Sequence, residues 1–133
     1  MKGLAFASAS LLLFGVWGFV AKVATDEAGS KFVFIFAQLP YIVIASVMLV
    51  LTGPYAVKWS SLRWTLLGGL FGAVGVLCFF FAIDHLPASR VVPMTAAYPA
   101  ITILLSWLIL HEKLTARHVV GVLFALVGVA LLA

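Results

Sequence analysis

Polar side chains beside prolines, in the middle of two long apolar stretches, are the residues of this sequence best suited to bind a solute. One stretch carries Gln38, Pro40 and Tyr41, and the other carries Pro93, Thr95, Tyr98 and Pro99. A proline inside a helix removes a backbone donor and crowds the preceding turn. In hydrocarbon such a kink is tolerated beside protein or a water-filled cavity. The pattern predicts a pocket lined by Gln38, Tyr41, Thr95 and Tyr98; alternatively, the prolines only shape packing.

Two residues of the first apolar stretch complete the candidate set. Trp17 is expected to line the same pocket, and Lys22 follows it about one turn before the stretch ends. Lys22 has two interpretations. Its ammonium could reach the headgroups while its stem stays in the apolar layer, or it could face the pocket mouth and attract anionic or carboxylate-bearing solutes.

The residues with catalytic chemistry do not form a catalytic constellation. Asp84 and His85 are neighbours in sequence, and neighbours do not face each other on a helix. His111-Glu112 lacks the second histidine of a zinc helix, and a metal site needs three or four ligands. We therefore expect no enzyme activity, no catalytic residue, no metal and no cofactor. The middle of every stretch lacks Asp and Glu, which disfavours a simple carboxylate-driven proton antiport.

The elements that must position these residues are spanning helices. Hydrophobic residues make up 65% of the 133 residues and charged residues 9%, far from the balance of soluble domains. A spanning helix needs about 20 mostly apolar residues. Five such segments are predicted, with short connections and a break at Pro54, giving an all-α integral membrane protein with one domain over 1–133. The segments run over about 3–24, 31–52, 62–86, 88–110 and 115–133.

Charge at the segment ends suggests how the chain sits in the bilayer. With the N-terminus in the cytoplasm, five of the eight basic residues lie on the inner side and three on the outer side, which favours that orientation. The net charge of +4 is scattered and forms no basic patch, so nucleic acid is not an expected partner. We expect a multi-pass protein of the cell's inner membrane, in contact with lipid.

Glycines mark faces where helices could approach closely. Gly68 and Gly72 form a GxxxG pair in the third segment, and Gly121 and Gly128 lie on roughly one face of the fifth. Such small residues let backbones meet in lipid. Either face could be an internal helix contact or a dimer contact.

The order of short motifs in the second half resembles a known transporter repeat. Leu86-Pro87-Ala88-Ser89 is followed by Tyr98-Pro99, by Glu112-Lys113-Leu114-Thr115 and then by Gly121 and Gly128. This order is similar to the EamA-like repeat of the drug/metabolite transporter superfamily. Trp17-Gly18 also resembles the family's first helix. The resemblance implies two five-helix repeats of opposite orientation around a central site, and transport of small metabolites or toxic solutes, often outward.

One repeat of this kind needs a second to complete a pathway. Because five crossings are an odd number, an antiparallel homodimer would reproduce the inverted pair, and a small charge bias permits it. We expect a secondary transporter, an exporter working by alternating access and completed by dimerisation. The alternative is a non-transporting membrane subunit that assembles with a larger membrane partner.

Overall fold

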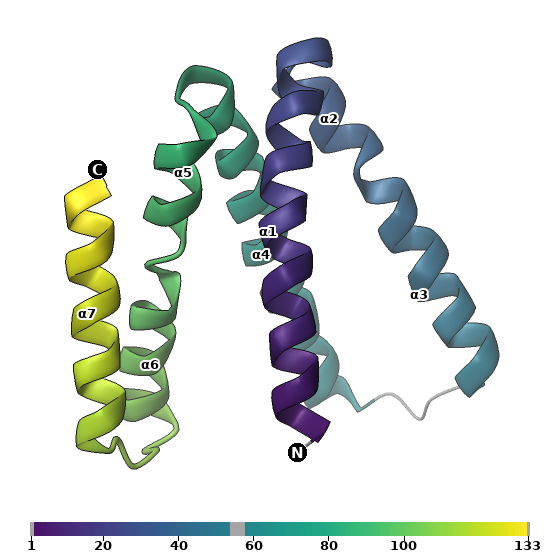
Figure 1. The fold of residues 1–133 in the computed structure, drawn as a ribbon. Helices are drawn as coiled ribbons and strands as arrows, with labels where there is room; N and C mark the ends of the chain where they lie inside the picture. The colour runs from purple at the N-terminus through teal and green to yellow at the C-terminus, as the bar shows by residue number, and fades with distance from the viewer. Residues whose placement is uncertain (1, 54–57, 133) are drawn as a thin grey trace. The chain divides into compact units, whose positions relative to one another are not determined.

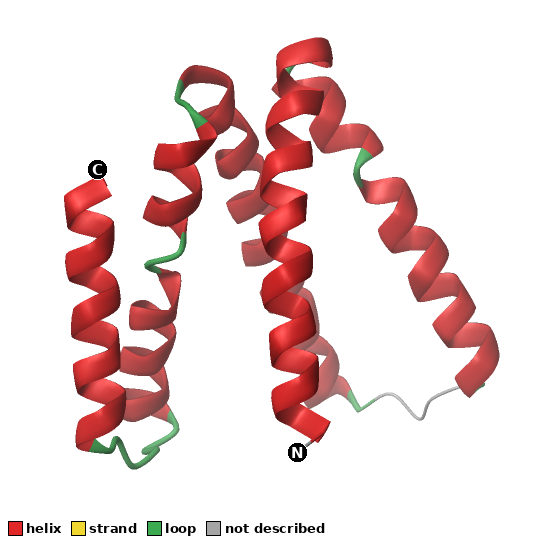
Figure 2. Ribbon diagram, viewed as in Figure 1, coloured by secondary structure: helices red, strands yellow, loops and turns green. Residues whose placement is uncertain are grey.

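The computed structural model describes residues 2–53 and 58–132, and it is helical almost throughout (Figures 1 and 2). The helices are α1 (Lys2–Ala28), α2 (Ser30–Phe36), α3 (Gln38–Thr52), α4 (Trp59–His85), α5 (Ala88–Thr95), α6 (Tyr98–Ile109) and α7 (Ala116–Leu132). The described residues contain no strand. The predicted class, an all-α membrane protein, is confirmed.

Within residues 2–53 and 58–132, four helical spans are long and apolar enough to cross a membrane when α2–α3 and α5–α6 are each counted as one interrupted span. They cover Lys2–Ala28, Ser30–Thr52, Trp59–His85 and Ala88–Ile109. The remaining apolar helix, α7, has 17 described residues. At 1.5 Å per residue its length is about 26 Å, at the short end of what spans a hydrocarbon layer. The predicted break at Pro54 and the predicted helix end at residue 133 lie outside the described residues.

The first connection is much shorter than the sequence suggested. Helix α1 continues through Ala28, and Gly29 alone separates it from α2. Gly29 has φ of +79°, a backbone conformation that glycine adopts without a steric penalty. Among the polar residues before it, Lys22 and Asp26, four residues apart, pair along one face of α1 and give this last part of the helix a small stabilisation. The reversal between α1 and α2 is therefore tight.

Both predicted kink regions contain a helix break (green in Figure 2). Helix α2 ends at Phe36, whose carbonyl cannot receive a hydrogen bond from Pro40, and α3 begins at Gln38. The Gln38 side-chain amide donates to the Phe34 carbonyl at 2.9 Å. At the second break, Thr95 Oγ1 donates to the carbonyls of Val91 at 3.0 Å and Val92 at 2.9 Å. Polar side chains beside the prolines thus bond to nearby helix carbonyls, which makes the breaks tolerable in lipid.

The chain divides into two compact units, Met1–His85 and Leu86–Ala133. In the first unit α1, α2 and α4 pack against one another, whereas α3 follows from α2 and has no comparable contact with α1 or α4 among the described residues. Figure 1 shows α3 running away from α1 below the kink. In the second unit α7 packs against α5 and α6.

The protein core of the first unit is concentrated at one end. Buried residues there come from the last turns of α1, from α2 and from the last turns of α4: Ala21, Thr25, Ser30, Val33, Phe79, Phe80 and Ile83. Helix α3 has no buried residue. The three helices are therefore tied together at the end where α1 and α4 finish, and α3 leaves them at the other end.

Candidate functional site

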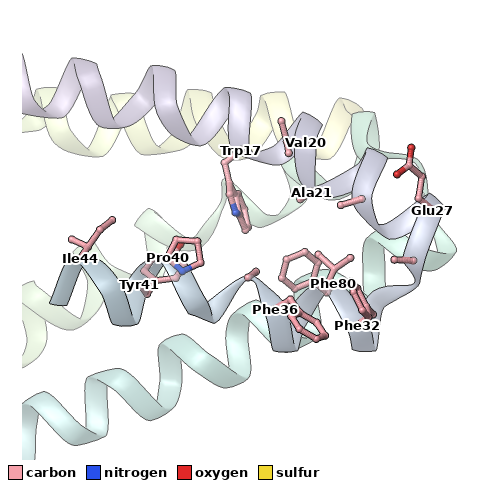
Figure 3. A pocket seen from close by; sticks show the side chains of 14 residues that line it. Trp17, Val20, Ala21, Glu27, Phe32, Phe36, Pro40, Tyr41, Ile44 and Phe80 are labelled. Atoms are coloured by element: carbon pink, nitrogen blue, oxygen red, sulfur yellow. The ribbon is translucent and has the colours of Figure 1, made fainter. Parts of the chain in front are cut away.

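A pocket of about 630 Å³ lies in the first unit between α1, α2 and α3, with one side chain of α4 at its base. Its volume is within the range of small-molecule sites. Five aromatic side chains and one carboxylate mark it: Trp17, Phe32, Phe36, Tyr41, Phe80 and Glu27. Figure 3 shows Trp17 pointing from α1 into the space between the helices, toward Phe36 and Phe80.

The rings at the base of the pocket are held by one another. Trp17 stacks on Phe79 with centroids 4.9 Å apart and an interplanar angle of 28°. It meets Phe80 edge to face at 6.1 Å and 67°. Phe80 is only 1% exposed and also packs against Phe34 at 6.5 Å. Offset-stacked and edge-to-face pairs are the favoured geometries of aromatic rings, so this surface is preorganised.

The kink after α2 positions the residues on the side of the pocket opposite α1. The chain turns at Ala37, and this change of direction places Pro40 and Tyr41 opposite Trp17 across the pocket (Figure 3). Tyr41 is 59% exposed. Pro40, one of the prolines expected to mark a binding pocket, is among the lining residues, and its part in substrate binding stays a prediction.

A polar cluster lies at the end of the unit where α1 and α4 finish. Lys22 Nζ donates to Asp26 Oδ1 at 2.6 Å and to the Ile83 carbonyl at 3.1 Å. Ser30 Oγ donates to Asp84 Oδ2 at 2.8 Å. The Ile83 carbonyl belongs to the last turn of α4, where carbonyls lack helical partners and a cation is favoured. This cluster, named here the α4 clasp (Lys22, Asp26, Ser30, Ile83 and Asp84), joins α1, α2 and α4.

The candidates from the sequence fall in three places. Trp17 and Tyr41 line the pocket. Gln38 and Lys22 belong to the same unit but are not among the described lining residues, since Gln38 bonds to Phe34 and Lys22 belongs to the α4 clasp. Thr95 and Tyr98 lie in the second unit, where Tyr98 is 63% exposed. Their role in binding stays a prediction.

The four packing glycines have open space beside them. A Cβ built on Gly68, Gly72, Gly121 or Gly128 meets no atom within 4 Å. Among the described residues, these faces therefore make no close helix approach inside either unit. Their predicted packing role remains a prediction for contacts made outside the unit.

Sequence reasoning missed Glu27, Phe32, Phe36 and Phe80. A signal existed for Phe32 and Phe36, which are four residues apart just before a proline kink; their rings lie 4.3 Å apart. Phe80 stands in a run of three phenylalanines, where nothing local distinguishes the inward ring. Glu27 falls in a stretch that the sequence suggested to be a connection.

The comparisons with known proteins give the family. The sequence model of the family described as "EamA-like transporter family" matches residues 1–133, the whole of the chain. The chain belongs to this family. Its members are transporters embedded in membranes, which agrees with the apolar helices of the EamA-like chain described above.

Relatives differ widely in how much of their length this EamA-like chain covers. A protein of Serratia proteamaculans, named a probable 4-amino-4-deoxy-L-arabinose-phosphoundecaprenol flippase subunit, ArnF, is 33% identical over 99% of the chain and 92% of its own length. The uncharacterized transporter YvbV of Bacillus subtilis is 28% identical, over 84% of the chain and 39% of its own length.

An uncharacterized membrane protein of Saccharomyces cerevisiae is 37% identical over 53% of the chain and only 17% of its own length. The EamA-like chain therefore spans less than half of the yeast and Bacillus relatives. No solved structure matches it significantly.

The α4 clasp yields a stability prediction. Lys22→Met removes both hydrogen bonds of a side chain that is 26% exposed, and leaves the Ile83 carbonyl without its partner. We expect the free energy of unfolding to fall by about 1 kcal/mol, because the bond to the Ile83 carbonyl is partly buried, whereas the exposed pair with Asp26 contributes little. Thermal unfolding in lipid nanodiscs measures it. Lys31→Met, which alters an exposed lysine of α2, is the matched control; equal shifts in both variants would remove the clasp's stabilising role.

Proposed function

We propose that the chain exports a small organic solute by alternating access, acting as one EamA-like repeat of an assembly with two. The observation that carries this proposal is the preorganised aromatic pocket, which lies beside a helix break inside the first unit. Ligand sites of membrane transporters form at interrupted helices of this kind. The pocket lies between helices that the α4 clasp holds together and a helix, α3, that makes no comparable contact with α1 or α4 among the described residues.

A second copy of the chain would complete the pathway. The relative named as a flippase subunit has almost the same length as this chain, since the match covers 99% of one and 92% of the other. In the proposed antiparallel homodimer the open glycine faces of α4, which carry Gly68 and Gly72, are available for contacts between copies. We place the dimer in the cell's inner membrane, with a cytoplasmic N-terminus in one copy and the reverse in the other.

Topology tests the assembly. A reporter fused to the C-terminus should be found on both sides of the membrane, and copies with two different tags should purify together. A C-terminus on one side only would exclude the antiparallel arrangement. Purification only with a different, larger membrane protein, without solute flux, would support the alternative of a non-transporting subunit.

Transport tests the pocket. In proteoliposomes we expect saturable, protein-dependent solute flux, and Tyr41→Ala should lower the transport efficiency about tenfold, which corresponds to about 1.4 kcal/mol of lost contact. Tyr41 and Ile42 are both 59% exposed on α3, but Tyr41 lines the pocket and Ile42 is not among its lining residues. Ile42→Ala is therefore the matched control. A normal rate for Tyr41→Ala, or equal loss in both variants, would remove the pocket from the transport pathway.

A further inference from the structure

We infer that the pocket of the first unit selects an organic cation whose apolar body lies on the aromatic rings and whose positive group lies near Glu27. This inference rests on the proposed function and names the class of solute that the same site would take. It follows from the charges, ring contacts and hydrogen bonds around the pocket.

The formal charge on the described lining residues of the pocket is negative. Among the described lining residues, Glu27 carries the single formal charge, and none is basic. Figure 3 places Glu27 near the end of α1, at the rim rather than between the rings. The carboxylate has no ion pair or hydrogen bond within the described part of the chain. A cation held at this rim would therefore meet a carboxylate that pairs with no described side chain of the unit.

Two basic residues lie close to Glu27 in the sequence, and neither is among the described lining residues. Lys31, four residues after Glu27, is exposed on α2 and makes no ion pair with it in the described part of the chain. Lys22 lies five residues before Glu27, and its ammonium bonds to Asp26 at 2.6 Å and to the Ile83 carbonyl at 3.1 Å. An anion entering the pocket would lose water without gaining a counter-charge, which is costly. The attraction of carboxylate-bearing solutes by Lys22, one of the two interpretations of the sequence, thus finds no support in the geometry.

The aromatic walls suit the rest of such a solute. Trp17, Phe36 and Tyr41 each present part of a ring to the pocket, and Trp17 is fixed by its stacking on Phe79. Ring faces attract cations, tryptophan most strongly, and the attraction grows when the cation is desolvated. An aromatic or aliphatic body replaces lipid or water against these rings. The combination favours a cation with an apolar body over a neutral molecule of the same shape.

Three probes of nearly equal shape test the inference: phenyltrimethylammonium, its neutral carbon analogue tert-butylbenzene, and benzenesulfonate. Binding is measured by calorimetry on the full chain in phosphatidylcholine nanodiscs, with empty nanodiscs subtracted. We expect phenyltrimethylammonium to bind, and to bind more tightly than the other two. Glu27→Gln should weaken its binding about fivefold, the effect of one exposed charge pair, and leave tert-butylbenzene unchanged.

The control removes an acid that is remote in sequence. Glu112→Gln changes an exposed carboxylate of the second unit and should leave all three probes unaffected. Glu27 is exposed, so the Glu27→Gln variant should fold. A second variant, Trp17→Phe, keeps an aromatic ring at this position. We expect it to weaken the binding of the cation severalfold. Tighter binding of benzenesulfonate, equal binding of all probes, no binding, or an unchanged affinity in Glu27→Gln would overturn the inference.

Failure of the inference is distinguishable from failure of the proposed function. Flux of a neutral or anionic solute that depends on Tyr41 would keep the transporter and refute the cation preference. Cation binding without flux of any solute would keep the site and refute transport.

Discussion

Phe80→Ala should lower the free energy of unfolding by about 3 kcal/mol, the largest stability effect we expect in this chain. Phe80 is 1% exposed, so it is surrounded by protein rather than by lipid. Its ring packs against Trp17, Phe34 and Phe79, which come from α1, α2 and α4. Between membrane helices, packing contacts replace the hydrophobic effect as the source of stability. Truncation would leave a cavity where three helices meet.

The control for this variant lies on the same helix. Phe71 of α4 is 71% exposed in the structure, so Phe71→Ala removes the same atoms from a surface outside the unit's core. We expect its effect on the free energy of unfolding to stay within about 0.5 kcal/mol. Reversible unfolding in mixed micelles measures both variants. Equal losses would show that the aromatic cluster is no tighter than the rest of α4, and would weaken the case for a preorganised pocket base.

In contrast to Phe80→Ala, Thr25→Val should stabilise the protein and raise the free energy of unfolding by about 1 to 2 kcal/mol. Thr25 is 2% exposed, and its hydroxyl has no hydrogen-bond partner among the described residues. A buried hydroxyl without a partner retains most of its desolvation cost, and valine replaces it with a methyl group of nearly the same shape. Both residues are β-branched, so the helix propensity of α1 changes little. The gain should appear as a higher unfolding temperature.

Thr65→Val separates this effect from a general preference for valine. Thr65 is exposed on α4, and its hydroxyl donates to the Ser61 carbonyl at 2.9 Å. Removing that satisfied group should be neutral or slightly destabilising. If Thr25→Val destabilises the protein instead, the hydroxyl has a partner outside the unit, in the second copy or in a transported solute. Transport assays on the same variant would then distinguish the two.

Much of the architecture could be predicted from residue order alone. The apolar stretches were long enough to require a membrane, and the prolines at positions 40, 93 and 99 lay beside both helix breaks. The motifs from Leu86 to Gly128 indicated the family that the comparisons then showed. These features are local, because hydrophobic length and the missing proline donor act through neighbours in the chain.

The candidate site was only partly predictable. Trp17 and Tyr41 were expected to bind the substrate; both line the pocket of the first unit, and their binding role stays a prediction. Lys22 was assigned to the headgroups or to the pocket mouth, yet it bonds to Ile83, 61 positions away. Ser30 likewise meets Asp84, 54 positions away. No local sequence pattern predicts such pairs, because polar residues are common at helix ends whether or not they bond to a distant part of the chain.

The sequence by itself determined that this chain is made of membrane helices of the EamA-like kind, with helix breaks near Pro40 and between Pro93 and Pro99. Only the tertiary structure decided which side of each helix faces its neighbours, and so which rings form the pocket and which polar groups form the α4 clasp. The physical reason lies in the solvent. Lipid tails are as apolar as a protein interior, so inward and outward faces need not differ in hydrophobicity. In the run from Phe79 to Phe81, packing alone separates a ring that is 1% exposed from one that is 39% exposed.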